Sequence, residues 1–134
     1  FQINHGFIDA PNFFIRILEK VNRANLYDDT MSFTEMSAEI VDEPFQSNYA
    51  NVYQKGALIN MCLDILIREK SGGKRGILWV MKNLAQKYGK EKPFKDDELI
   101  NEITAMTYPE VREFFDRHIV GNIPIDYNNY FTKV

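Results

Sequence analysis

Four consecutive residues, Tyr53-Gln54-Lys55-Gly56, are the least ordinary chemical feature of this sequence. The apolar pattern around them is typical of a helix, and glycine inside a helix costs ~1 kcal/mol relative to alanine. Such a glycine indicates that another group approaches the backbone closely. At helical spacing Tyr53 shares a face with Ala57, Asn60 and Asp64. A hydroxyl, a small residue and two polar groups therefore form a stripe that is suited to border a cavity.

This stripe supports two interpretations. In the structural one, Tyr53 is an amphipathic side chain at the edge of the core, and Asp64 caps or pairs locally. In the functional one, the Tyr53 hydroxyl donates a hydrogen bond to an oxyanion that develops during a reaction. Physical reasoning on these residues alone favours the structural interpretation. In both, Lys55 is a snorkelling or ion-pairing side chain and Gly56 is a close-packing site.

The other reactive side chains form no recognisable catalytic pattern. A catalytic zinc needs three protein ligands, whereas the chain has two histidines, His5 and His118, at opposite ends and no His-Glu-x-x-His pattern. His118 lies near the end of a predicted helix, where an imidazole suits the helix dipole. Cys62, the only cysteine, lies in an apolar stretch that favours a buried structural thiol. The residues 72–76 lack the strand and the ending of a phosphate loop.

Helices must position these residues, because apolar side chains recur at helical spacing and strand-like alternation is missing. We predict helices over residues 9–25, 32–43, 48–70, 74–88, 95–106 and 109–121, with a short last turn from residue 126. The expected inward side chains are Phe14, Ile17, Leu18 and Val21; Val52, Ile59, Leu63, Leu66 and Ile67; Ile77, Val80, Met81 and Leu84; Leu99, Ile103 and Met106; and Val111, Phe114, Phe115 and Ile119, with Tyr130 and Phe131 as final anchors. The third helix is the most apolar and should be central. The fold class is therefore all-α, a single domain over residues 1–134 built as a bundle of about six helices.

Composition narrows the classes of function. The 134 residues carry a net charge of −3, and 45% of them are hydrophobic. A nucleic-acid binder usually shows a basic surplus, so we expect no nucleic-acid partner. No apolar run reaches the about 20 residues that a membrane helix needs, so we expect no membrane segment. The start at Phe1, without methionine, leads us to expect a piece of a larger protein.

The sequence around the Tyr53–Gly56 element resembles the glycyl aminopeptidase family of thermolysin-like zinc metallopeptidases. A Tyr-x-Lys-Gly element is shared with alanyl aminopeptidases and leukotriene-hydrolase-type enzymes. The ordered set that carries the resemblance spans the whole chain: residues 52–58, 63–68, 76–81, Leu84, Tyr88-Gly89, Phe114-Phe115-Asp116-Arg117 with 118–121, and 124–127.

The resemblance implies the C-terminal helical part of a catalytic domain. In such enzymes the tyrosine corresponding to Tyr53 assists zinc in stabilising the tetrahedral intermediate, and Lys55 and Gly56 support the motif. The zinc ligands and the general base lie upstream of the position of Phe1 in the family. We therefore expect no cofactor in this chain and no activity of it alone, with zinc in the full-length parent.

Under this interpretation the parent removes N-terminal glycine or another small residue from peptide substrates. The family also suggests an exported or periplasmic location. A homodimer through an exposed apolar face is left open. The alternative is a stand-alone helical interaction module without catalysis, which would need neither the Tyr53–Gly56 element nor the abrupt start.

Overall fold

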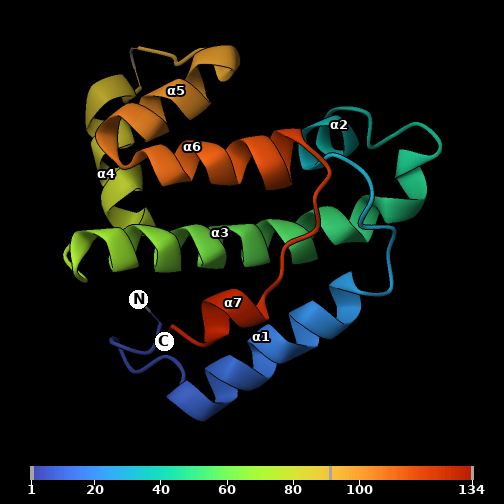
Figure 1. Ribbon diagram of the computed structural model, residues 1–134, viewed down its shortest axis with the longest axis horizontal. Helices are drawn as coiled ribbons and strands as arrows, with labels where there is room; N and C mark the ends of the chain where they lie inside the picture. The colour runs from blue at the N-terminus through green and yellow to red at the C-terminus, as the bar shows by residue number, and fades with distance from the viewer. Residues whose placement is uncertain (1, 91, 134) are drawn as a thin grey trace.

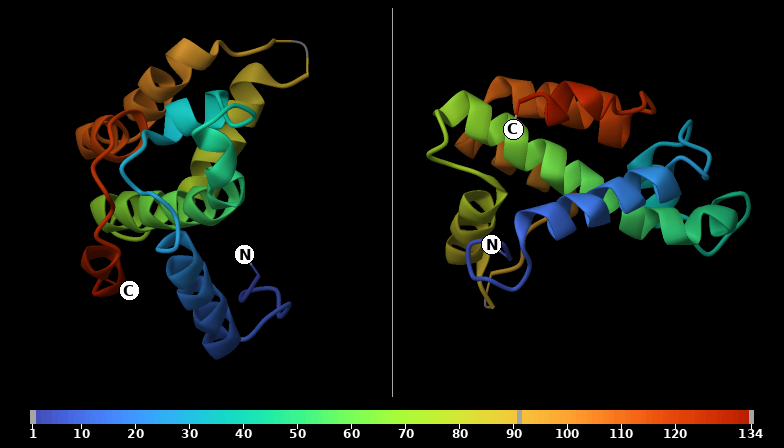
Figure 2. Two further views of the ribbon diagram at one scale, coloured as in Figure 1. Left: turned by 90° about the vertical axis from the view of Figure 1, so that its right-hand side faces the viewer. Right: turned by 90° about the horizontal axis from the view of Figure 1, so that it is seen from below.

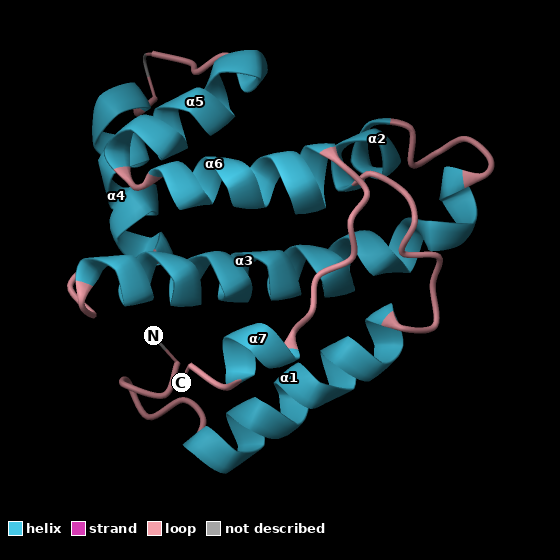
Figure 3. Cartoon of the chain, in the orientation of Figure 1, coloured by secondary structure: helices cyan, strands magenta, loops and turns pink. Residues whose placement is uncertain are grey.

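The computed structural model describes residues 2–90 and 92–133, and throughout that part of the chain it consists of helices and their connections (Figures 1 and 3). The predicted all-α bundle of about six helices is confirmed. Phe1 lies outside the described residues. The elements are α1 (Ala10–Ala24), α2 (Phe33–Ala38), a 3-10 turn η1 (Phe45–Asn48), α3 (Tyr49–Ser71), α4 (Ile77–Tyr88), α5 (Asp96–Met106), α6 (Pro109–Phe115), a π-helical turn η2 (Asp116–Val120) and α7 (Asn128–Phe131).

Local sequence signals set several helix ends. The Asp9 carboxylate accepts a hydrogen bond from the Asn12 amide at 2.8 Å, and so satisfies a free N–H group at the start of α1. The Ser32 hydroxyl caps α2 by accepting from the Glu35 amide at 3.4 Å. Helix α3 ends at Gly72, which adopts the left-handed conformation with φ 60°, and glycine tolerates this conformation without strain.

Helix α3 is the central element, as its all-round apolar surface predicts. Figure 1 shows it crossing the molecule, with α6 on one side, α1 and α7 on the other and α4 near its C-terminal end. The views in Figure 2 show α1 lying across α3 and α5 stacked beyond α6. The main core cluster comprises Ile59, Cys62, Leu63, Leu66, Ile67, Val80, Val111, Phe114, Phe115, Ile119 and Ile125. A smaller cluster of Ile17, Ala24 and Leu58 joins α1 to α3.

Three boundaries of the six predicted helices differ from the prediction by more than one residue. Helix α2 ends at Ala38 instead of continuing to residue 43, because Met36 is its only buried side chain and Val41 is left 71% exposed. Helix α4 begins at Ile77 instead of Lys74, because a side chain from α3 caps it there. The end of the predicted 109–121 helix widens into η2, where the Gly121 amide donates to the Asp116 carbonyl at 3.0 Å.

The inward-facing sets are correct for α3 and α6 but only partly correct for α1 and α4. Phe14 and Leu18 of α1 are 52% and 58% exposed, and Met81 of α4 is 59% exposed. Helix α1 therefore buries a narrower face than its sequence pattern offers. Tyr130 and Phe131 do pack against the two core clusters, as predicted for the last turn. No helix in the described segments is both long and apolar enough to cross a membrane.

Candidate functional site

The side chain of Tyr53 extends from the first half of α3 and is 64% exposed. Its hydroxyl lies 3.4 Å from the hydroxyl of Tyr49, one helical turn earlier, and the two rings meet edge to face. The hydrogen bond with Tyr49 is the main cause that raises the pKa of Tyr53 above its usual value. The phenol therefore keeps its proton at neutral pH and is able to act as a hydrogen-bond donor.

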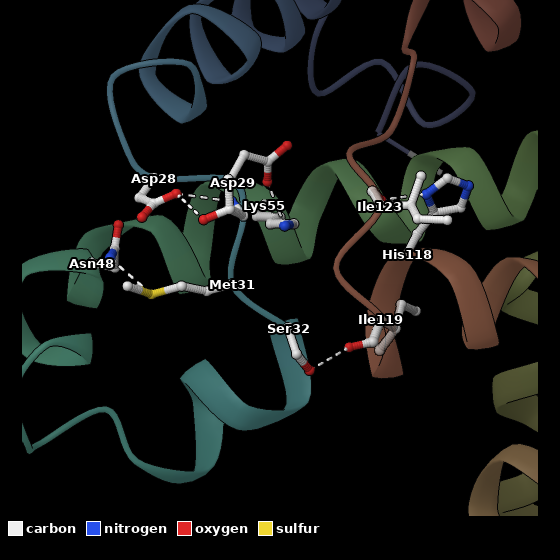
Figure 4. Close-up of polar contacts among 10 residues, drawn as sticks. Asp28, Asp29, Met31, Ser32, Asn48, Lys55, His118, Ile119 and Ile123 are labelled. Carbon is white, nitrogen blue, oxygen red and sulfur yellow. Dashed lines mark hydrogen bonds and ion pairs between the residues drawn. The ribbon is translucent and has the colours of Figure 1, made fainter.

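Two residues along the same helix, Lys55 is buried instead of exposed, with 3% of its surface accessible. Its ammonium group pairs with the carboxylate of Asp29, in the connection between α1 and α2 (Figure 4). Of the two roles open to Lys55, ion pairing is the one found. Because an unpaired buried charge is costly, this contact fixes the rotation of α3 relative to the 25–32 connection.

Further contacts hold the same connection in place on both sides (Figure 4). The Asn48 side-chain amide lies 3.4 Å from the sulfur of Met31. The Ser32 hydroxyl donates to the carbonyl of Ile119 in η2 at 3.2 Å. The 25–32 connection thus links the N-terminal half of α3 to the π-helical turn, and the backbone that carries Tyr53 is firmly positioned.

Gly56 lies against the ring of Phe33, but this contact does not require a glycine. A Cβ atom built at Gly56 would meet the Phe33 Cζ at 3.4 Å, which is ordinary van der Waals contact. The packing therefore leaves room for a methyl group at this position. The Gly56 carbonyl also accepts a hydrogen bond from the Asn60 side chain at 2.8 Å, which orients the first amide of the polar stripe.

Asp64, at the far end of the stripe, has a structural role. Its Oδ1 accepts from the Ile77 amide at 2.7 Å, and its Oδ2 accepts from Arg68 Nε at 2.7 Å. The carboxylate therefore caps α4 from the side of α3. Gly76 is needed for this approach, since a Cβ there would lie 2.3 Å from Asp64 Oδ1. The structural interpretation of Asp64 as a local cap is confirmed.

An apolar groove of about 350 Å³ lies on the polar stripe's side of α3, between α1, α4 and α7. Asn60 and Asp64 line it, so it shares their helix face with Tyr53. Its remaining lining is Phe13, Phe14, Met61, Ile65, Ile77 and Phe131. The exposed Phe14 forms one wall, and Leu18 follows it one turn later on the same face of α1. The groove is apolar and lies toward the middle of α3, so only Asn60 and Asp64 of the predicted stripe border it and Tyr53 does not.

The remaining chemically active side chains are placed apart. His118 accepts or donates a hydrogen bond with the Ile123 carbonyl at 2.7 Å, and His5 lies in the N-terminal segment. Cys62 is fully buried, and burial raises the pKa of its thiol to about 12. Within residues 2–90 and 92–133, no three His, Cys, Asp or Glu side chains gather closely enough to hold a metal.

Sequence reasoning missed two partners of the motif. Tyr49 was not singled out, although its spacing of four residues from Tyr53 is the signal that places both rings on one helix face. Asp29 lies between the first two predicted helices, and nothing in the local sequence links it to a lysine 26 residues away. Comparison of the chain with protein-family models, curated proteins and solved structures finds no match in any of the three.

Proposed function

We propose that this chain is the helical lobe of a zinc-dependent aminopeptidase that removes N-terminal glycine or another small residue from peptides. The lobe contributes Tyr53 as a donor to the oxyanion of the tetrahedral intermediate. Zinc, held by residues outside this chain, would supply Lewis-acid chemistry in the parent enzyme. The chain alone is inactive in this proposal, because no zinc ligands or general base are among its assigned residues.

The observation that carries this proposal is the exposed, protonated phenol of Tyr53 on a firmly held helix. An oxyanion donor must be accessible to substrate, must keep its proton and must not need to reorganise during the reaction. Tyr53 is 64% exposed, its pKa is raised, and the Lys55–Asp29 ion pair holds its helix. The apolar groove on the same face of α3 supports the proposal, because another part of the enzyme or a second copy of the chain can cover it.

The test is chelator-sensitive hydrolysis of a glycyl anilide by the full-length parent, measured beside this 134-residue chain. In the parent, Tyr53→Phe should lower kcat by about 10²–10³, the usual cost of removing one oxyanion donor. KM should change little, because the hydrogen bond forms only in the transition state. Folding should be unaffected, since the hydroxyl is at the surface.

Tyr49→Phe is the matched control, because it removes the neighbouring hydroxyl and keeps the ring. It should leave kcat within a few fold of the parent. An unchanged kcat in Tyr53→Phe would remove Tyr53 from the reaction, and an equal loss in both variants would indicate a role for the pair in local structure instead.

The second candidate is a stand-alone helical interaction module, and the apolar groove is the observation that favours it. A parent that holds zinc and is inert toward peptides would support the module. Hydrolysis by the parent that a chelator abolishes, together with no hydrolysis by this chain alone, would support the enzyme.

A further inference from the structure

A second groove, of about 310 Å³, lies on another face of α1 and has the opposite character. It is lined by Arg16, Glu19, Lys20, Arg23 and, from α3, Gln54. At 100° per residue, its cationic side chains lie on the side of α1 opposite Phe14 and Leu18, so this groove is separate from the apolar one. Three cations and one carboxylate leave the groove with a net charge of +2, in a chain whose net charge is −3.

The charges of this groove are not used by the fold. Elsewhere in residues 2–90 and 92–133, eight lysine or arginine side chains form ion pairs. Arg16, Lys20 and Arg23 are not among them. Glu19 also lacks an ion-pair partner there, although it lies three and four residues from the two arginines. The three cations therefore line the groove without an ion-pair partner among the described residues, and Glu19 offsets only one of their charges.

Contact with α3 holds the middle of the groove in place. Lys20 is half-buried, and its ammonium group lies 3.4 Å from Gln54 Oε1. A neutral amide positions the lysine without cancelling its charge. Arg16 and Arg23 lie about one helical turn to either side of it, and each guanidinium presents a planar fork of donors that matches two oxygens of one anion.

We propose that this groove binds a small dianionic oxyanion, a phosphate group, with Arg16 and Arg23 as its two clamps and Lys20 between them. The net charge of +2 matches a phosphate dianion, and the groove of about 310 Å³ is large enough to admit one. A carboxylate carries half that charge and should bind more weakly. This inference is independent of the proposed catalytic role of Tyr53.

The test is an NMR titration of the whole chain at constant ionic strength and pH 7.5, with inorganic phosphate, phenyl phosphate and acetate as probes. Saturable shifts of α1 resonances are expected with both phosphates, and acetate should bind at least about tenfold more weakly. Preference for phenyl phosphate would identify an esterified group as the ligand, and preference for inorganic phosphate a free ion. Binding of inorganic phosphate should weaken below about pH 7, and binding of phenyl phosphate below about pH 6, where each probe loses its second charge.

Variants locate the site. The Arg16→Gln, Arg23→Gln double variant should weaken phosphate binding at least about tenfold, whereas Glu19→Gln should strengthen it about twofold to threefold. A control that removes two exposed lysines elsewhere, Lys74→Gln with Lys82→Gln, should leave it unchanged. Circular dichroism establishes that each variant is folded. Unsaturable shifts, or equal weakening by the control, would overturn the proposal and show only diffuse attraction of anions to a cationic surface.

Discussion

Lys55 combines a full charge with almost complete burial, and the Asp29 carboxylate pairs with it directly. Asp29 retains about a third of its side-chain exposure, so the two partners of the pair are not equivalent. Water can still solvate the carboxylate if the lysine is removed. If the carboxylate is removed, the ammonium group stays buried without a counter-charge.

This asymmetry predicts unequal effects of breaking the pair from its two sides. Asp29→Asn should lower the free energy of unfolding by about 3 kcal/mol, because it leaves a buried charge unpaired. Lys55→Met keeps the aliphatic volume and removes that charge, so it should cost less. Urea denaturation of both variants checks the order. A larger loss in Lys55→Met would show that the lysine's other interactions outweigh its pairing.

For the motif residues, the sequence predicts their positions on their own helix but not their contacts with other elements. The spacing of Tyr53, Asn60 and Asp64 on one face is fixed by the helical repeat and follows from the sequence. The partner of Lys55 could not be found in this way, because Asp29 reaches it only through the packing of α1 on α3. The buried carbonyl oxygen of the Asn51 side chain, which has no hydrogen-bond partner in the described residues, has no sequence signal either.

At the scale of elements, the junction of α3 with α4 depends on Gly76, because this residue has no side chain. The carboxylate of Asp64 occupies the space beside Gly76 and caps the first amide of α4. The sequence signal for a helix start at Lys74 was therefore overridden by a tertiary cap. The π-helical turn η2 also ends at a crowded glycine, because a Cβ atom built on Gly121 would lie 2.5 Å from the Asp116 carbonyl oxygen.

Two glycine-to-alanine substitutions compare a crowded glycine, Gly76, with one that has room for a methyl group, Gly56. Gly76→Ala should lower the free energy of unfolding by about 1–3 kcal/mol, because its Cβ would overlap the Asp64 carboxylate. Gly56→Ala is the matched control, in which the new methyl group meets Phe33 at an ordinary distance. It should be neutral or stabilise the protein by up to about 1 kcal/mol through helix propensity.

Thermal and chemical denaturation of the two variants measure these effects. Introducing Asp64→Ala together with Gly76→Ala should make the glycine substitution less costly than it is alone, because the overlapping group is gone. An equal cost with and without Asp64 would assign the role of Gly76 to its backbone alone.

At the scale of the whole molecule, three groups in the core or packed against it resist losing a proton. Burial raises the pKa of Cys62 and of Tyr130 to about 12, and burial together with the Asp29 carboxylate raises the pKa of Tyr127 further. In the unfolded chain these groups lose their protons near pH 8.5 for the thiol and near pH 10 for the phenols. Alkaline pH therefore favours the unfolded state.

Because the folded state holds these protons more tightly, their contribution to the free energy of unfolding is fully present below about pH 8.5 and declines as the pH rises toward 12. The temperature of unfolding, followed by circular dichroism, should fall steadily between pH 9 and pH 11. The Tyr127→Phe, Tyr130→Phe double variant should lose less stability over this interval. A temperature of unfolding that stays constant from pH 8 to pH 11 would contradict the prediction.

The fold class and the central position of α3 were predictable because they depend on the period and breadth of the apolar pattern. The exposure of Phe14 and Leu18 was not, since it depends on how much of α1 its neighbours cover. A pattern of apolar residues gives the face that a helix is able to bury, and the number of elements around it decides how much of that face is used.

The unequal size of the two core clusters has a consequence for how the protein opens. Helix α1 contributes only Ile17 and Ala24 to the buried core, and both belong to the smaller cluster. Cooperative units with few buried side chains separate at a lower free energy than the rest of a domain. Helix α1 should therefore undergo local unfolding from α3 while the larger cluster stays intact. The Lys55–Asp29 ion pair, which lies beyond the C-terminal end of α1, opposes this opening.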